Sequence, residues 1–171
     1  MRSLSGEEPT PVLLEWVRSF IRPADIVLDV GGGDKRYHDL GCAGIVSVDA
    51  WEKAEPNVLI DLEREDLPFR PRSFDVVLLL DFLEHVTKSR GWSVLQQSVE
   101  VASRTVLVLT PLPDYWNPNC WPVETPDCWW FGNQWAYHRS MWAPRDFPCP
   151  PWVRDHLDGM DAYLIAHRTI G

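Results

Sequence analysis

Five short apolar runs, each with a polar residue near its carboxyl end, organise the first two thirds of the chain. They cover residues 26–30, 45–49, 58–62, 73–81 and 104–111. Because the runs are nearly continuous rather than alternating, they are typical of strands buried on both faces of a parallel sheet. Apolar residues at helical spacing over residues 92–102 predict a helix that leads back to the fifth strand. The pattern therefore predicts an α/β fold.

Further elements are predicted on either side of these strands. Residues 10–21 carry apolar side chains at helical spacing, with Pro11 at the first helical position. Residues 35–40 allow only a very short helix, whose free N–H groups would point at a ligand. Near the end of the chain, residues 152–157 and 162–167 flank a turn and predict a β-hairpin.

Three glycines directly follow the first predicted strand. At Gly31, Gly32 and Gly33 only backbone can face a ligand. Open α/β sheets bind ligands at the carboxyl ends of their strands, and glycines there let a bulky cofactor approach the chain. Asp49 ends the second strand about twenty residues later, the interval expected of a ribose-binding carboxylate. The chain therefore carries the pattern of a nucleotide-type site.

Residues 24–112 resemble the class I, Rossmann-like S-adenosylmethionine-dependent methyltransferases, in particular their broad small-molecule group. The matching segments are 27–33, 48–49, 61–62, 67–69, 73–77 and 81–86. The resemblance implies a seven-stranded, mostly parallel sheet with helices on both faces and a C-terminal antiparallel β-hairpin. The chain departs from the family at Lys35, where a further glycine is usual.

The resemblance also implies S-adenosylmethionine as cofactor and S-adenosylhomocysteine as product. Asp29 would lie near the cofactor's amino group, Asp49 would bind the ribose, and Asp61 would bind the adenine amine beside the Leu62 backbone N–H. Trp51 would lie against the adenine face. The full set of expected cofactor residues is Asp29, Gly31, Gly33, Asp49, Trp51, Asp61, Leu62 and Asp81. Two alternatives stay open, in which Asp29 accepts from loop N–H groups and Trp51 packs on a neighbouring side chain.

Residues 81–85 form a second chemical cluster after the fourth predicted strand. On a helix, Asp81, Glu84 and His85 would share one face. They could hold or deprotonate a methyl acceptor, bind a divalent cation as the similar motif of ubiquinone-type and small-RNA methyltransferases does, or simply order the loop. His138 lies in a segment that resembles the family's substrate side. We expect Glu84, His85 and His138 to be the catalytic residues, and we expect no bound metal.

The composition changes abruptly over residues 111–151, which hold nine prolines and six of the ten tryptophans. This segment is predicted to be an ordered lid at the binding edge, where stacked rings could grip an acceptor. The alternative is that the tryptophans only fix the loop to the sheet. We expect one domain with an N-terminal helix (1–23), a cofactor-binding core (24–110), the lid (111–151) and a terminal hairpin (152–171).

Charge and cysteine content limit the classes of partner and metal that the chain is expected to bind. The net charge is −9 over 171 residues, and no local basic stripe offsets it, which opposes binding to nucleic acid and to anionic membranes. The first residues lack the apolar core of a signal peptide, so we expect a cytoplasmic protein. No cysteines show C-x-x-C spacing, although Cys120, Cys128, His138 and Cys149 could in principle converge on zinc.

The expected function is methyl transfer from S-adenosylmethionine to an oxygen or nitrogen of a small-molecule acceptor. Two other classes stay open. A methyltransferase-like protein that binds the cofactor without turnover would fit the altered glycine loop. A nicotinamide-dependent oxidoreductase would also use a glycine turn and a ribose acid, but Arg36 stands where the last glycine of G-x-G-x-x-G would be.

Overall fold

The structure is a computed structural model that describes residues 10–33, 35, 37–115 and 132–171. Its helices and strands are α1 (Pro11–Ser19), β1 (Ile26–Val30), β2 (Gly44–Asp49), β3 (Val58–Leu59), β4 (Phe74–Leu80), α2 (Lys88–Val101), β5 (Ala102–Pro111), β6 (Val153–Asp155) and β7 (Tyr163–Thr169). Short 3-10 helices are η1 (Glu52–Ala54), η2 (Leu83–His85), η3 (Pro113–Tyr115), η4 (Gln134–Ala136) and η5 (Pro144–Asp146).

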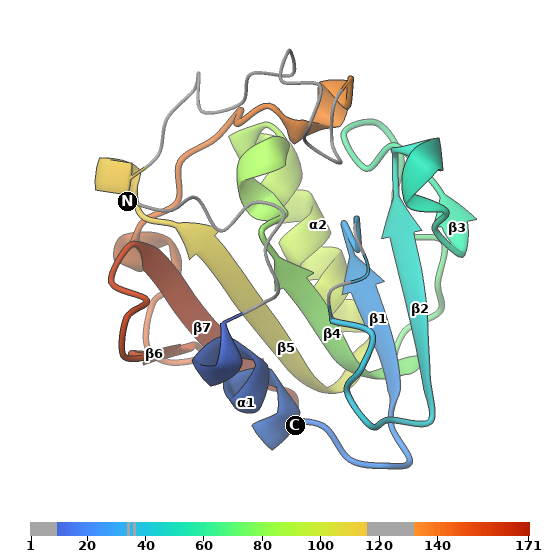
Figure 1. Ribbon diagram of the computed structural model, residues 1–171, viewed down its shortest axis with the longest axis horizontal. Helices are drawn as coiled ribbons and strands as arrows, with labels where there is room; N and C mark the ends of the chain where they lie inside the picture. The colour runs from blue at the N-terminus through green and yellow to red at the C-terminus, as the bar shows by residue number, and fades with distance from the viewer. Residues whose placement is uncertain (1–9, 34, 36, 116–131) are drawn as a thin grey trace.

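All seven strands belong to one sheet with the order β3-β2-β1-β4-β5-β7-β6 (Figure 1). Strands β1 to β5 pair in parallel, whereas β7 runs antiparallel to both of its neighbours, β5 and β6. Only β7 is therefore reversed in the sheet. The prediction of a mostly parallel, seven-stranded sheet that ends in an antiparallel hairpin is confirmed.

The central strands are buried on both faces, as their continuous apolar runs predicted. Successive side chains alternate between two cores because a strand has a period of two residues. Leu28, Val77, Leu79 and Val106 pack into the core that includes Val94 and Leu95 of α2. Val27, Val76, Leu78 and Leu107 pack into the core that includes Leu13 and Val17 of α1. The eight strand side chains are all 0% exposed.

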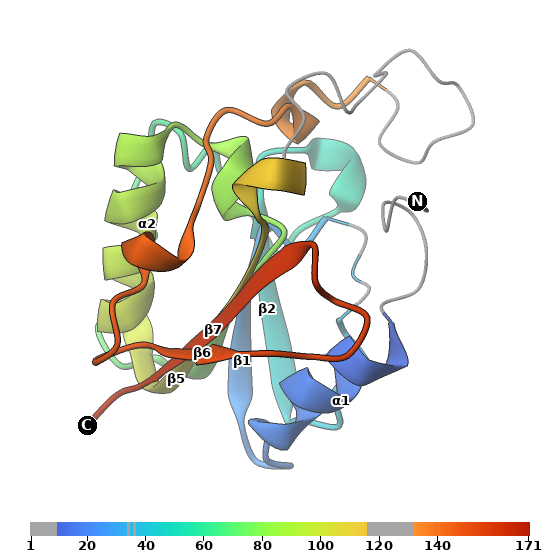
Figure 2. The same cartoon turned by 90° about the vertical axis from the view of Figure 1, so that its left-hand side faces the viewer.

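The two α-helices cover opposite faces of this sheet (Figure 2). Helix α1 begins at Pro11, as predicted. The indole Nε1 of Trp16 donates to Asp155 Oδ2 at 3.1 Å, and the same oxygen lies 2.7 Å from His167 Nδ1. These contacts join α1 to the terminal hairpin. Among the residues that the structure describes, no helix has the length and apolar character needed to cross a membrane.

The short helix predicted over residues 35–40 is wrong for the residues described there. Residues 31–33, 35 and 37–43 contain no helix. Gly31, Gly33 and Lys35 have φ angles of 74°, 22° and 58°, and such left-handed backbone does not continue into a right-handed helix. Instead, the chain turns tightly, with the Lys35 N–H donating to the Gly32 carbonyl at 2.8 Å. The glycine loop therefore lacks the helix dipole that the sequence indicated.

Part of the proline- and tryptophan-rich segment 111–151 packs into the core. Trp142 is 0% exposed, and its ring lies 5.2 Å from that of Trp92 and 5.8 Å from that of Phe147, between centroids. Its Nε1 donates to the Leu83 carbonyl at 3.0 Å. For Trp142, the alternative that the ring fixes the segment in place is the one observed. Trp116, Trp121, Trp129 and Trp130 lie outside the described residues.

The contact between Trp142 and α2 depends on a glycine. A Cβ at Gly91 would lie 2.5 Å from Trp142 Cζ2. We expect Gly91→Ala to lower the free energy of unfolding by about 1–3 kcal/mol, because overpacking outweighs the roughly 1 kcal/mol gain in helix propensity. Urea unfolding followed by circular dichroism measures the change. Gln96→Ala, at an exposed position of the same helix, is the control, and a Gly91→Ala protein more stable than its parent would contradict this packing.

Candidate functional site

The glycine loop lies at the carboxyl end of β1 and admits backbone only. The Gly31 N–H donates to the Val48 carbonyl at 2.8 Å, which joins the loop to β2. A Cβ at Gly31 would lie 2.6 Å from the Phe82 ring, and one at Gly32 would lie 2.7 Å from Asp29 Oδ2. Side chains at these positions would therefore displace the loop. The glycines are therefore required by packing against Phe82 and Asp29, and only their backbone groups could meet a ligand.

Asp49 binds the glycine loop from the end of β2. Its Oδ2 accepts from the Gly33 N–H at 3.0 Å, and its Oδ1 accepts from the Trp51 N–H at 2.8 Å. Burial raises the pKa of Asp49 above its usual value, although these two N–H groups oppose the shift. Trp51 itself is 7% exposed. The structure thus brings together three of the expected cofactor residues, Gly33, Asp49 and Trp51.

Asp29 carries a buried oxygen without a hydrogen bond. The residue is 2% exposed, and its Oδ2 makes no hydrogen bond with the residues that the structure describes. The Nε2 of His38 lies 3.4 Å away and is likewise without a hydrogen bond among those residues. A buried acceptor of this kind is costly unless a partner reaches it, which fits the expected place beside a cofactor amino group. No periodic or spacing signal in the sequence indicated His38.

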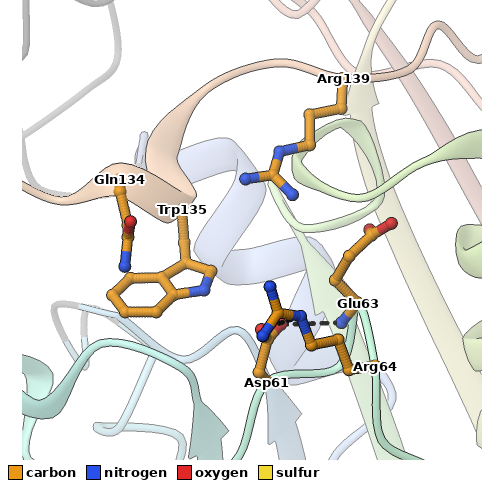
Figure 3. A pocket seen from close by; sticks show the side chains of 6 residues that line it. All are labelled: Asp61, Glu63, Arg64, Gln134, Trp135 and Arg139. Carbon is orange, nitrogen blue, oxygen red and sulfur yellow. Dashed lines mark hydrogen bonds and ion pairs between the residues drawn. The ribbon is translucent and has the colours of Figure 1, made fainter.

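A small polar pocket lies next to Asp61 (Figure 3). It encloses about 150 Å³ and is lined by Asp61, Glu63, Arg64, Gln134, Trp135 and Arg139. Leu62, the other residue expected near the adenine, is 3% exposed, and its carbonyl accepts from Arg90 Nε. Of the six lining residues, Asp61 was predicted individually. Gln134, Trp135 and Arg139 lie in the segment 111–151 that was predicted to cover the binding edge, whereas Glu63 and Arg64 were not predicted.

The expected helical face of Asp81, Glu84 and His85 is wrong. Asp81 has a φ of 54°, so the backbone is left-handed there, and only Leu83–His85 forms a 3-10 turn. Glu84 is nevertheless 2% exposed and accepts from the Thr110 hydroxyl at 2.9 Å. Burial, and secondarily the charge of Asp81, raises the pKa of Glu84 well above its usual value. A neutral Glu84 is therefore favoured by its surroundings.

His138 joins Glu84 and His85 from a distant segment of the chain. One potential ligand atom from each of these three side chains lies within 4.8 Å of the other two, and the two imidazole centroids are 5.0 Å apart. Burial lowers the pKa of His85 to about 3, with a further contribution from the charge of His138, and burial lowers the pKa of His138 to about 4. Both rings are therefore neutral at neutral pH and can accept a proton.

Backbone hydrogen bonds hold this cluster together. The Glu84 carbonyl accepts from the N–H groups of Arg139 at 2.7 Å and Ser140 at 3.1 Å. The Leu83 carbonyl accepts from the Ser140 hydroxyl at 2.9 Å and from the Trp142 indole. These bonds fix the segment after η4 against the end of β4. The three residues predicted to be catalytic, from two separate motifs, thus form one cluster.

The cluster has the donor set of a metal site. Two imidazole nitrogens and one carboxylate oxygen are a common ligand set for divalent transition metals, and here these atoms lie within 4.8 Å of one another. The absence of a metal therefore remains a prediction. The other zinc set considered from the sequence includes Cys120 and Cys128, which lie outside the described residues, while the thiol of Cys149 is free.

The fold is shared with methyltransferases of known structure. A chain of the complex between the Haloferax volcanii Trm112 methyltransferase activator and a protein provisionally described as a methyltransferase is similar, with a TM-score of 0.64 and 11% identity over 91% of this chain and 86% of that one. Magnesium protoporphyrin IX methyltransferase from Synechocystis PCC 6803, solved with bound S-adenosylhomocysteine, is also similar. Its TM-score is 0.56, with 16% identity over 93% of this chain and 80% of that one. These likenesses extend over nearly the whole chain.

A third structure, provisionally described as a methyltransferase from Bacillus halodurans, has a TM-score of 0.51 and 16% identity over 61% of this chain. The match spans 52% of that protein, so the chain covers about half of its length. No protein-family model and no curated protein sequence matches the chain. At these identities the comparisons bear on the fold: the chain has the fold of the class I S-adenosylmethionine-dependent methyltransferases.

The buried carboxyl of Glu84 leads to a test by substitution. Because the pKa of Glu84 is raised in the folded state, the stability that its neutral form contributes is present at low pH and lost as the pH rises through that pKa. Glu84→Gln keeps an acceptor for Thr110 and cannot ionise, so we expect it to match the parent at pH 4, below the unfolded-state pKa, and to exceed it at pH 8. Urea unfolding at both pH values measures the difference.

Glu84→Ala is the matched comparison for this test. It removes the acceptor of a buried hydroxyl, and we expect its free energy of unfolding to be about 1–3 kcal/mol below that of Glu84→Gln at both pH values, because neither variant ionises at this position. Equal losses of stability in the glutamine and alanine variants at pH 8 would show that the carboxyl is not destabilised by its burial.

Proposed function

We propose that the chain binds S-adenosylmethionine at the carboxyl ends of β1 and β2 and transfers its methyl group to an oxygen or nitrogen of a small-molecule acceptor. The observation that carries this proposal is the strand order, in which a reversed β7 lies between β5 and β6. The dinucleotide-binding order is 3-2-1-4-5-6 with parallel strands. The reversed strand therefore favours methyl transfer over hydride transfer to a nicotinamide.

The residues at this edge fit the proposed cofactor. The Oδ2 of Asp29, which lies 3.4 Å from His38 Nε2 but makes no hydrogen bond with the described residues, would accept from the methionyl amino group. Asp49 would accept from the ribose hydroxyls while it keeps the loop N–H of Gly33. Asp61 and the Leu62 N–H would bind the adenine, with Trp51 beside it. Gly31, Gly33 and Asp81 would lie along the cofactor between its methionyl group and its adenine. Each role would be filled by a side chain or backbone group already held at the sheet edge.

When bound, the cofactor supplies an electrophilic sulfonium methyl group. The chain then needs mainly to orient the acceptor in line with that group and to exclude water. A proton leaves the acceptor oxygen or nitrogen during transfer, and a neutral imidazole can take it. His138 is the proposed base, because it is less enclosed than Glu84; its pKa of about 4 leaves the ring unprotonated at neutral pH but makes it a weak base. His85 and Glu84 would position it.

The partners proposed for this chain follow from its charge. A net charge of −9 opposes binding to nucleic acid and to anionic lipid, so a small-molecule acceptor in the cytoplasm fits better. A protein that binds the cofactor without turnover is the alternative. It would bind S-adenosylmethionine in the same way but would release no S-adenosylhomocysteine with any acceptor.

Calorimetric titration tests the cofactor class. We expect the purified protein to bind S-adenosylmethionine and S-adenosylhomocysteine with micromolar affinity and not to bind NAD, because the Asp29 and Asp49 sites match a methionyl nucleoside. The NAD titration is the control. Binding of NAD alone would contradict the proposal and favour a nicotinamide-dependent function. Binding of none of the three would contradict the proposed cofactor site.

Substitution of Asp49 tests the ribose role. We expect Asp49→Asn and Asp49→Ala to weaken cofactor binding by about 1–3 kcal/mol, because buried hydrogen bonds to the carboxylate would be lost. The asparagine variant retains an acceptor for the Gly33 N–H and so separates the ribose role from loop stability. Asp158→Asn, at an exposed position, is the control. Unchanged affinity in both Asp49 variants would remove Asp49 from the ribose role.

Proton NMR tests whether His138 can act as a base. Since its pKa is lowered to about 4, we expect the ring to stay neutral from pH 8 down to about pH 5 and to gain its proton only near pH 4. The same resonance in urea-unfolded protein is the reference, at about 6.5. A folded-state midpoint equal to the unfolded one would contradict the lowered pKa and show that burial does not disfavour the charged ring.

A further inference from the structure

The pocket of Figure 3 holds four charged side chains, of which three already have partners. Asp61 Oδ1 accepts from the Glu63 N–H at 3.0 Å, and its Oδ2 lies 3.6 Å from Arg64 Nε. The two oxygens of Glu63 accept from the N–H and the hydroxyl of Thr87 at 2.9 and 2.8 Å. Both carboxylates and one guanidinium of the pocket are therefore engaged.

The guanidinium of Arg139 is the remaining charge. It makes no hydrogen bond or ion pair with the residues that the structure describes, and it points into the pocket between Trp135 and Glu63 (Figure 3). Its backbone does not move freely, because the Arg139 N–H donates to the Glu84 carbonyl at 2.7 Å. The pocket thus presents a guanidinium that no hydrogen bond from the described residues occupies, on a fixed piece of backbone, although its two arginines and two carboxylates balance in formal charge.

The position of Arg139 links the pocket to the proposed base. Arg139 follows His138 directly, and its backbone is bonded to Glu84, so both lie beside the Glu84, His85 and His138 cluster. The charge of Arg139 also contributes to the lowered pKa of His85, after burial and the charge of His138. A molecule bound to Arg139 would therefore lie within reach of the cluster.

We propose that this pocket binds the carboxylate of a small, flat acid, which is the methyl acceptor, through Arg139, with the indole of Trp135 against its planar part. The proposal rests on the proposed methyl transfer and names its acceptor class. The planar fork of an arginine matches a carboxylate in two parallel hydrogen bonds, and an indole offers a flat apolar surface. A monoanion also suits the pocket better than a phosphate dianion, because repulsion from Asp61 and Glu63 grows with the charge of the ligand.

Isothermal titration with matched probes tests this assignment. The probes are 4-hydroxybenzoate, indole-3-carboxylate and nicotinate, each paired with its neutral amide, added to the full chain saturated with S-adenosylhomocysteine. We expect at least one acid to bind, and its amide to bind at least tenfold more weakly. Arg139→Gln should weaken binding of that acid at least tenfold while leaving the affinities for its amide and for S-adenosylhomocysteine unchanged. Arg145→Gln, at an exposed position outside the pocket, is the control and should bind like the parent.

Several results would overturn the proposal. These are binding of none of the acids by the parent protein, equal binding of acid and amide, or unchanged acid binding in Arg139→Gln. Competition between the acid and S-adenosylhomocysteine would also overturn it, because the pocket would then belong to the cofactor.

The same titrations separate this proposal from the proposed function. If S-adenosylhomocysteine binds but no acid does, the acceptor assignment fails and the cofactor assignment stands. If an acid binds through Arg139 to a protein that binds no S-adenosylhomocysteine, the methyl-transfer proposal fails, and with it the role of the acid as acceptor.

Discussion

Burial of the central strands on both faces decides where this molecule can carry out chemistry. Strands β1, β4 and β5 have core on each side, with side chains such as Leu28, Val77 and Leu107 wholly enclosed. Charged groups in the middle of such strands would lose hydration without compensation. The reactive groups therefore gather at the ends of the strands, where the loops can supply hydrogen bonds, as Asp49 and Glu84 show.

The same constraint explains why much of the fold could be predicted from the sequence. Strands enclosed on both faces must be continuously apolar, so their positions and the edge that carries the acids were visible in the pattern. The helix expected after the glycine loop was not formed, because Gly31, Gly33 and Lys35 have left-handed backbone. Lysine seldom adopts a left-handed conformation, so the local sequence did not predict one at Lys35.

The cluster of Glu84, His85 and His138 was predictable residue by residue but not as an assembly. Glu84, His85 and His138 were each identified, yet their proximity depends on the Glu84 carbonyl accepting from Arg139 and Ser140 across more than fifty positions of the chain. Backbone hydrogen bonds of this kind carry no side-chain signature. Asp81 shows the converse problem, since its positive φ removed the helical face that the spacing suggested. Arg139 was overlooked because a single arginine in a loop has no periodic signal.

The reversed strand β7 has a consequence for how such a protein can diversify. It pairs with β5 on one side and β6 on the other, so it fixes both ends of the connection formed by residues 112–152. Once the ends of a loop are fixed, doubling its length costs only about 0.6 kcal/mol of closure entropy. Insertions and deletions there, away from the anchor at Trp142, would reshape the wall that holds Trp135 and Arg139 while β1 and β2 keep their geometry. Changes in one loop could thus alter which molecule the proposed acceptor pocket takes and leave the proposed cofactor edge intact.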